Sequence, residues 1–316
     1  MRNYLLKAGV LSLILAFGFT SCNKEGVYKP KEKISKIHYE YSYEIYQNGE
    51  LVNQDSHKYL DQIWHWKGKK LTQIENSEDW PSNFIYKGNQ LEKIEMGEMT
   101  VNFTYKKSLL DKVEAIEDDK TIFSISIDAR EDKKITRMIC QYYYYYDDRY
   151  YPILHQKSNN ADKQTLASAN RMESIMALVL PTGFSDILAK SAAKKGRKST
   201  EIETRIIELT YDGNNIIEQK ITDEDGYNST YVFTYDKYKN PHYKSFLGAA
   251  ALSEDGSFIQ SENNVLTLSS KDDPEYTVKF EYTYENDFPA TQTVRYTYGN
   301  EWYQEESIRT IHYEYK

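Results

Sequence analysis

Cysteine is scarce in this sequence, and beyond residue 21 no long apolar run occurs. Only Cys22 and Cys140 are present among the 316 residues, so no set of intrachain disulfides can staple the fold. Cys140, in the stretch RMICQYY, is expected to be a small buried hydrophobic residue. The missing apolar run leaves residues 22–316 without a segment that could cross a bilayer as a helix.

The first 22 residues, MRNYLLKAGVLSLILAFGFTSC, have the layout of an export signal. Arg2 and Lys7 form a positive start, and Ala8 to Phe19 form an apolar run that is too short to span a bilayer. The stretch resembles a bacterial lipoprotein signal, which is cleaved before a cysteine whose thiol is then lipidated. Phe19 stands where such signals usually carry leucine. We expect a signal peptide over 1–21 and palmitate-type lipidation at Cys22; the alternative is an ordinary secretory signal.

The charge balance bears on possible partners. Removal of residues 1–21, which contain two basic residues and no acidic one, would leave 295 residues with 38 basic and 48 acidic side chains, a net charge of −10. A negative surface argues against nucleic acid and against charge-driven binding to anionic lipid heads. The expected contact with the membrane is therefore the lipid anchor, followed by a tether over 22–33.

Alternating side chains dominate the remainder of the chain. In the stretch KIHYEYSYEIYQNGE, Ile and Tyr side chains from Ile37 to Ile45 fall on one face, and polar residues fall on the other. This period of two is typical of a half-buried strand, and Asn48-Gly49 is a strong hairpin signal. The pattern returns around Val101, Phe233 and Val278. It predicts an antiparallel β meander.

A short internal repeat supports this prediction. LTQIE at Leu71, LEKIE at Leu91 and LDKVE at Leu110 share one form, and the F-x-Y stretches FIY and FTY lie between them. Each unit is predicted to be one hairpin laid against the next. The pentapeptide IHYEY occurs at both ends, over 37–41 and 311–315, which indicates duplication, similar environments or chance.

One segment departs from the pattern. Residues 161–193 are rich in Ala, Leu, Met and Ser, with Met172, Ile175, Met176 and Val179 at helical spacing and a break at Pro181. A helical insert and basic linker over 159–200 is predicted, between β-hairpin regions at 34–158 and 201–316. Packing on the sheet is favoured over insertion into a membrane.

The L-x-x-(I/V)-E hairpins, the F-x-Y and Y-x-Y strands, the stretch FTYDKYKNP at Phe233 and the lipoprotein signal together resemble one family. These features are similar to Bacteroidota envelope lipoproteins whose repeat region is a domain of unknown function with a porin-like fold, and more distantly to YD-repeat proteins. The resemblance implies a mainly β fold, a curved sheet or open porin-like barrel. It implies no functional residue.

A watery interior is also expected, because the predicted inward faces carry Tyr at most positions. The opposite faces carry Lys, Glu, Thr and Ser, which disfavours a lipid-facing barrel.

No catalytic or metal-binding motif is present. The six histidines are scattered, although His57 and His65 could meet across a hairpin. Acidic groups such as Glu117–Asp119 and Asp223–Asp225 fall in predicted turns, where Asp is common. We therefore expect no enzyme, no cofactor and no metal, with a carboxylate-dependent glycosidase as the least favoured alternative.

The stretch QYYYYYDDRYYP over 141–152 is the one candidate binding surface. Its tyrosines are either packed architecture on both faces of a central strand or one row that stacks on a sugar or protein; the row would comprise Tyr142, Tyr144, Tyr146, Tyr150 and Tyr151. The overall prediction is a lipid-anchored outer-membrane protein, facing either side, that binds a glycan or an envelope protein without catalysis. A periplasmic assembly or chaperone factor is the alternative.

Overall fold

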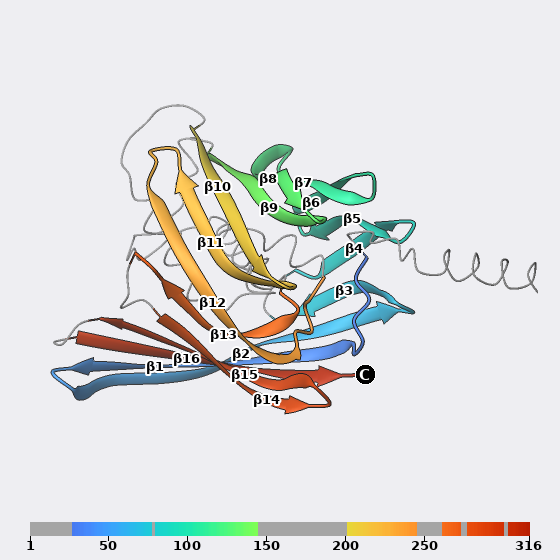
Figure 1. Ribbon diagram of the computed structural model, residues 1–316. Helices are drawn as coiled ribbons and strands as arrows, with labels where there is room; N and C mark the ends of the chain where they lie inside the picture. Colours follow the sequence, from blue (N-terminus) through green and yellow to red (C-terminus); the bar gives the residue numbers. More distant parts are fainter. Residues whose placement is uncertain (1–26, 78–79, 145–200, 245–260, 273–276, 300–302) are drawn as a thin grey trace, which may run out of the picture.

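A computed structural model of the 316-residue chain describes residues 27–77, 80–144, 201–244, 261–272, 277–299 and 303–316. These residues form one antiparallel sheet that closes on itself as a barrel of 16 strands (Figure 1). Each strand pairs with its neighbours in sequence, and β1 pairs with β16 to complete the ring. The sheet is therefore an up-and-down barrel without free edges.

The predicted first hairpin region supplies nine strands: β1 (Ile34–Gln47), β2 (Glu50–Lys67), β3 (Lys70–Asn76), β4 (Ser82–Lys87), β5 (Gln90–Met96), β6 (Met99–Lys106), β7 (Leu109–Glu117), β8 (Lys120–Glu131) and β9 (Lys134–Tyr144). The second region supplies seven: β10 (Glu201–Asp212), β11 (Asn215–Asp223), β12 (Asn228–Lys239), β13 (Asn263–Ser270), β14 (Thr277–Glu285), β15 (Phe288–Gly299) and β16 (Tyr303–Tyr315). The antiparallel meander is confirmed, and both regions contribute to the same barrel.

Turn chemistry explains the local hairpins. Asn48 and Gly49 join β1 to β2 with φ values of 53° and 80°, the left-handed geometry of a tight hairpin turn. The predicted repeat is also observed, because Leu71, Leu91 and Leu110 each lie at the start of a strand in a hairpin and are buried. The short repeat is therefore a hairpin repeat.

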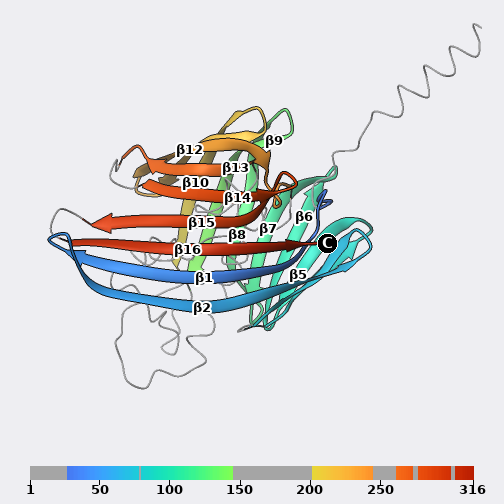
Figure 2. The same ribbon diagram turned by 90° about the horizontal axis from the view of Figure 1, so that it is seen from below.

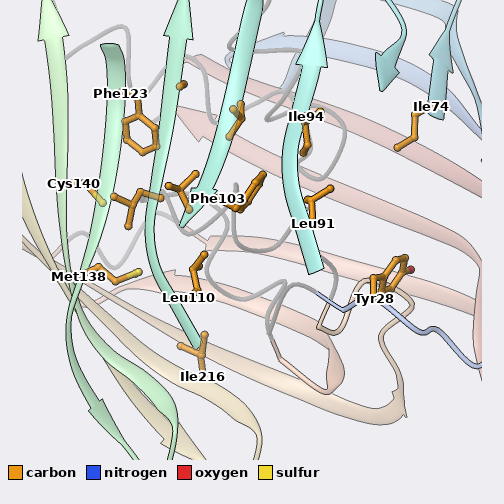
Figure 3. Close-up of a cluster of buried hydrophobic side chains, with 14 of the residues drawn as sticks. Tyr28, Ile74, Leu91, Ile94, Phe103, Leu110, Phe123, Met138, Cys140 and Ile216 are labelled. Carbon is orange, nitrogen blue, oxygen red and sulfur yellow. The ribbon is translucent and has the colours of Figure 1, made fainter. Parts of the chain in front are cut away.

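Alternation along the strands divides the side chains between two faces. Most inward-facing residues of β3 to β9 are aliphatic or aromatic, and many of them are nearly inaccessible. Figure 3 shows Ile94, Phe103 and Met138 among them. Burying one such side chain contributes about 1.5–3 kcal/mol to stability. A dry apolar core therefore lines much of the inner wall.

Contacts across the barrel identify which face points inward. The segment after β12 is separated from β1 by four strands in the barrel order. Yet Pro241 accepts a 2.6 Å hydrogen bond from the Tyr28 hydroxyl, and the His242 ring lies 6.1 Å from Trp64 of β2 and 6.0 Å from Tyr313 of β16. Such contacts span the interior, so the buried face is the inner one.

The outward face is charged and hydroxylated. Side chains on this face form the ion pairs Lys112–Glu114 at 2.6 Å and Lys271–Glu218 at 2.5 Å. The hydroxyls of Thr283 and Thr291 lie 2.7 Å apart on the same face. A barrel that faces lipid instead carries an outward apolar band. The described outward surface has the reverse polarity.

One end of the barrel is bound together by a repeated hydrogen bond, which we call the clasp ring. At this end a side chain from each of seven even-numbered strands (β2, β4, β8, β10, β12, β14 and β16) donates to a backbone carbonyl near the start of the preceding odd-numbered strand. The bonds are 2.5–2.9 Å long: Trp66 to Ile34, Tyr86 to Leu71, Arg130 to Leu110, Tyr211 to Ile135, Tyr235 to Ile216, Tyr282 to Val265 and Tyr315 to Pro289. The clasp ring therefore aligns the ends of neighbouring strands at this end of the barrel.

Lysines reinforce the clasp ring from the solvent side. Lys33 donates to the Gly68 carbonyl at 2.8 Å, and its ammonium lies 5.8 Å from the centroid of the Trp66 ring. Lys70 repeats the arrangement with the Gly88 carbonyl at 2.5 Å and the Tyr86 ring at 5.2 Å. These positions follow the hairpin repeat, so the sequence repeat encodes the clasp.

The wall is uneven in height because its strands differ in length. β1 has 14 residues and β4 has six. Since the clasp ring aligns one end, the difference of roughly 25 Å along the strand emerges at the other end. The β1–β2 hairpin consequently extends beyond the short strands (Figure 2), and Leu51 and Val52 near its tip are about half exposed.

The structure differs from the sequence-based expectations in the closure of the barrel and in the composition of its inner wall. The barrel is closed by β1 and β16 and is not an open curl. The inner wall is not mainly tyrosine, because Ile, Leu, Val and Phe fill it along β3 to β9. The predicted helical insert over 159–200 lies outside the described residues, and no helix occurs within them.

The repeated pentapeptide IHYEY has a structural explanation. Its two copies lie on β1 and β16, and they pair antiparallel about the His38–His312 pair, with Ile37 opposite Tyr313 and Tyr39 opposite Ile311. The two copies therefore form one part of the β1–β16 pairing, which is the seam that closes the barrel.

Candidate functional site: the polar inner wall

The inner wall changes character where the barrel closes. From β14 through β16 and β1 to β2 it carries polar and aromatic groups in place of a continuous apolar surface. We call this surface the polar inner wall; it comprises Tyr39, Gln62, Tyr282, Gln292, Arg309 and Tyr313.

A chain of hydrogen bonds fixes one half of this wall. The Tyr313 hydroxyl donates to the Gln292 side-chain carbonyl at 3.0 Å, and the Gln292 amide donates to the Tyr282 hydroxyl at 3.1 Å. Burial raises the pKa values of Tyr282 and Tyr313 well above the ordinary value for tyrosine. Both phenols therefore stay neutral and act as rigid hydrogen-bonding groups.

The other half of the polar inner wall has buried donors for which the described residues supply no acceptor. The Gln62 carbonyl oxygen accepts from the Trp64 indole at 3.3 Å, but its Nε2 is buried without a partner. The Nε of Arg309 is likewise buried without an acceptor. Buried polar groups are normally paired, so unsatisfied groups on one wall mark a candidate site.

The stretch FTYDKYKNP, residues 233–241, positions the segment after β12 that packs against this wall; we call this segment the floor. Asp236 accepts hydrogen bonds from the Asn264 backbone and side chain, each at 3.2 Å, and from the Tyr284 hydroxyl. Asn240 donates to the Ser261 carbonyl at 3.0 Å, and its side-chain oxygen accepts from the His242 backbone at 2.9 Å. The motif therefore directs Pro241 and His242 into the barrel.

His242 is the titratable group of this floor. It is 8% exposed and packs against Trp64 and Tyr313. Burial lowers the pKa of His242 to about 4, because the interior disfavours the imidazolium. The ring is therefore neutral near pH 7.

A second polar group lies on the inner wall further around the barrel, at β9 and β10. The Arg205 guanidinium pairs with Glu203 at 2.5 Å and lies 5.3 Å from the centroid of the Tyr142 ring. Tyr142 packs in turn on Phe123, with ring centroids 5.0 Å apart. Here the inward arginine has its own carboxylate.

The structure places only part of the predicted tyrosine row. Tyr142 and Tyr144 belong to β9, and the described ring of Tyr142 is held between Phe123 and Arg205. Tyr143, on the opposite face, donates to Gln141 at 3.1 Å. Tyr146, Tyr150 and Tyr151 lie outside the described residues, as does Cys22. A binding role for this row stays a prediction.

The described residues give no support to a metal or carboxylate centre. His57 and His65 belong to the same strand, β2, so the idea that they meet across a hairpin was wrong. The acidic groups at Asp118 and Asp225 lie in turns, as expected. Across the described ranges, no group of three potential metal ligands is close enough to hold an ion. Cys140 is buried, as predicted, and forms no disulfide with another described residue.

The sequence did carry a signal for the site residues that were missed. Along β16, Arg309 falls on the same face as Ile311 and Tyr313, so a charged residue occupies an inward position. Gln62 likewise shares the inward face of β2 with Trp64. Polar residues on the apolar phase of an alternating strand were the pattern to look for.

Comparison with known proteins gives structural matches only. No family model and no curated protein matches the sequence. Within the part of the chain described above, no helix has the length and apolarity needed to cross a bilayer. The chain is similar to a porin-like protein from Bacteroides uniformis, with 11% identity and a TM-score of 0.47 over 92% of this chain and 100% of that one. It is also similar to a porin-like protein from Bacteroides vulgatus, with 11% identity and a TM-score of 0.44 over 90% and 99%.

Proposed function

We propose that this protein is a lipid-anchored barrel of the bacterial cell envelope that binds a glycan without catalysis. The polar inner wall is the observation that carries the proposal. It combines phenol rings with amides and unsatisfied donors, and such groups bind sugars through stacking and hydrogen bonds. Tyr282, Gln292 and Tyr313 provide a fixed surface, and Gln62 provides a free amide donor.

The polarity of the barrel supports a location in water. Its described outward face carries ion pairs and threonine pairs, whereas a membrane-spanning barrel needs an apolar band there. Attachment to the outer membrane would then come from lipid on Cys22, as the FTSC ending of the signal predicts. The Cys22→Ala protein should lose incorporated palmitate and leave the membrane fraction. Persistent labelling would refute the anchor.

A glycan microarray and titration calorimetry test the binding proposal. The mature chain should retain one glycan class, and Gln62→Leu should weaken that binding at least tenfold, because the amide donor is lost. Gln73→Leu is the matched control, since Gln73 is the outward neighbour on β3 and bonds Asn83 at 3.0 Å. Equal effects of the two substitutions, or no retained glycan, would count against the proposal.

The tall β1–β2 hairpin favours a second candidate, contact with an envelope protein. Leu51 is 47% exposed and Val52 is 51% exposed, and successive strand residues face opposite sides. Such a tip would suit docking into an apolar groove. Cross-linking in intact cells should capture a partner that Leu51→Glu abolishes. If capture is unchanged in that variant, the hairpin is not the contact.

A further inference from the structure

Arg309 occupies an unusual position on the polar inner wall. It is 3% exposed, and it lies between Val294 of β15 and Tyr41 of β1 in the strand register. Its neighbours on the same face of β16 are Ile311 and Tyr313. A guanidinium therefore points into the barrel from the face of β16 that also carries Ile311 and Tyr313.

No described residue balances the charge of Arg309. Its Nε has no acceptor, and none of the ion pairs between described residues includes it. Tyr39 is the ionisable group whose pKa responds to it, and burial keeps that phenol neutral. An unpaired buried charge is costly, because neither water nor a carboxylate compensates its lost hydration.

Arg205 is a second inward arginine of this barrel, and it has a different set of partners. It has a similar exposure of 8%, but Glu203 pairs with it at 2.5 Å and Tyr142 covers it. The inward acid Asp236 is already occupied by Asn264 and Tyr284. The two arginines differ in that Arg205 has a described counter-charge, whereas Arg309 has none among the described residues.

We propose that Arg309 anchors an internal site for an anion, which takes the carboxylate or phosphate group of the bound ligand. The planar guanidinium binds either group through two parallel hydrogen bonds. This inference rests on the proposed function and narrows the ligand to an acidic glycan. The Gln62 amide, on the same wall two strands away, is a donor for the uncharged part of such a ligand.

Melting temperatures of the full mature chain, at constant ionic strength set with sodium chloride, test the site. The probes are glucuronate, inorganic phosphate and uncharged glucose. A ligand that binds only the folded state raises the melting temperature in a saturable way. We expect this rise in melting temperature with glucuronate or with phosphate. The probe that raises it shows whether the site binds a carboxylate or a phosphate group.

Three variants complete the test. Arg309→Met should abolish the rise and should melt higher than the wild type in chloride alone, because a buried unpaired charge is removed. Arg309→Lys should weaken the response about tenfold, since it keeps the charge without the fork. Arg295→Met is the control on the neighbouring strand, where Arg295 faces outward near Glu281 at 3.6 Å, and should keep the full rise.

Each outcome has a distinct meaning. Equal rises in wild type and Arg309→Met, or no rise with either anion, would overturn the anion site. If neutral glycans still bind the microarray-tested protein, only this inference fails and the proposed function stands. If Arg309→Met melts lower than the wild type and neither protein responds, Arg309 has a structural role only.

Discussion

Acid should destabilise this barrel through His242, and the structure gives the size of the effect. The ring is buried between Trp64 and Tyr313, and its pKa falls from the usual 6.5 to about 4 because the interior disfavours the charged form. The unfolded chain would take up a proton near pH 6.5, whereas the folded chain resists until pH 4. Stability from neutral His242 is therefore complete above pH 6.5 and is lost as pH falls toward 4.

The depressed pKa corresponds to about 3 kcal/mol, at 1.36 kcal/mol for each pKa unit. His242→Phe keeps an aromatic ring at the same place and removes the titration. Urea unfolding at intervals from pH 7.5 to 4 should show a smaller loss of stability in this variant than in the wild type. Carboxylates also titrate in this range, so the difference between the two proteins is the relevant quantity.

A matched control separates burial from the mere presence of a histidine. His312→Gln changes an outward histidine that is 40% exposed and lies 3.6 Å from Glu40. Its pH profile should follow that of the wild type closely. If His242→Phe and wild type lose the same free energy between pH 6.5 and 4, the buried-histidine argument is refuted.

Other substitutions test the clasp ring, the core and one turn. Tyr86→Phe removes a clasp donor and should cost about 1 kcal/mol, a fall in melting temperature of about 2–4 °C, whereas Tyr227→Phe, with a tyrosine that is 66% exposed, should change nothing. Ile125→Ala, at a fully buried position, should lose about 2–5 kcal/mol in urea unfolding; a loss below 1 kcal/mol would mean that the inner wall is loosely packed. Gly97→Ala would place a methyl group 3.2 Å from the Trp80 ring at a φ of 57°, so both stability and tryptophan fluorescence should change, and an unchanged spectrum would contradict that contact.

Much of the architecture could be predicted from the sequence because hairpins are local. The alternation from Ile37, the turn at Asn48-Gly49 and the repeat starting at Leu71 each predict a hairpin, and the structure has those hairpins. Closure could not be predicted, because the pairing of β1 with β16 joins residues that are 256 to 281 positions apart in the sequence. The alternation of apolar and polar residues along a strand does not specify how many strands close the barrel.

The character of the interior was harder to predict, and tyrosine is the reason. Tyrosine was expected to line a wet lumen, but in the clasp ring Tyr86 and Tyr211 bury their rings and use each hydroxyl to join hairpins. The same residue type thus serves as core and as hydrogen-bond donor. Alternation reveals which face a tyrosine occupies, but it does not reveal whether that face is wet.

The candidate site was missed for a related physical reason. Catalytic and metal motifs are recognised because their residues lie close in sequence, whereas Gln62, Gln292 and Arg309 are assembled by the closing seam between distant strands. Each residue looks ordinary within its own strand. The copies of IHYEY are the one sequence feature that indicates the seam, since they pair about His38 and His312. A search for polar residues on the inward phase of the strands beside that seam leads to Arg309, a buried charge for which the described residues supply no partner.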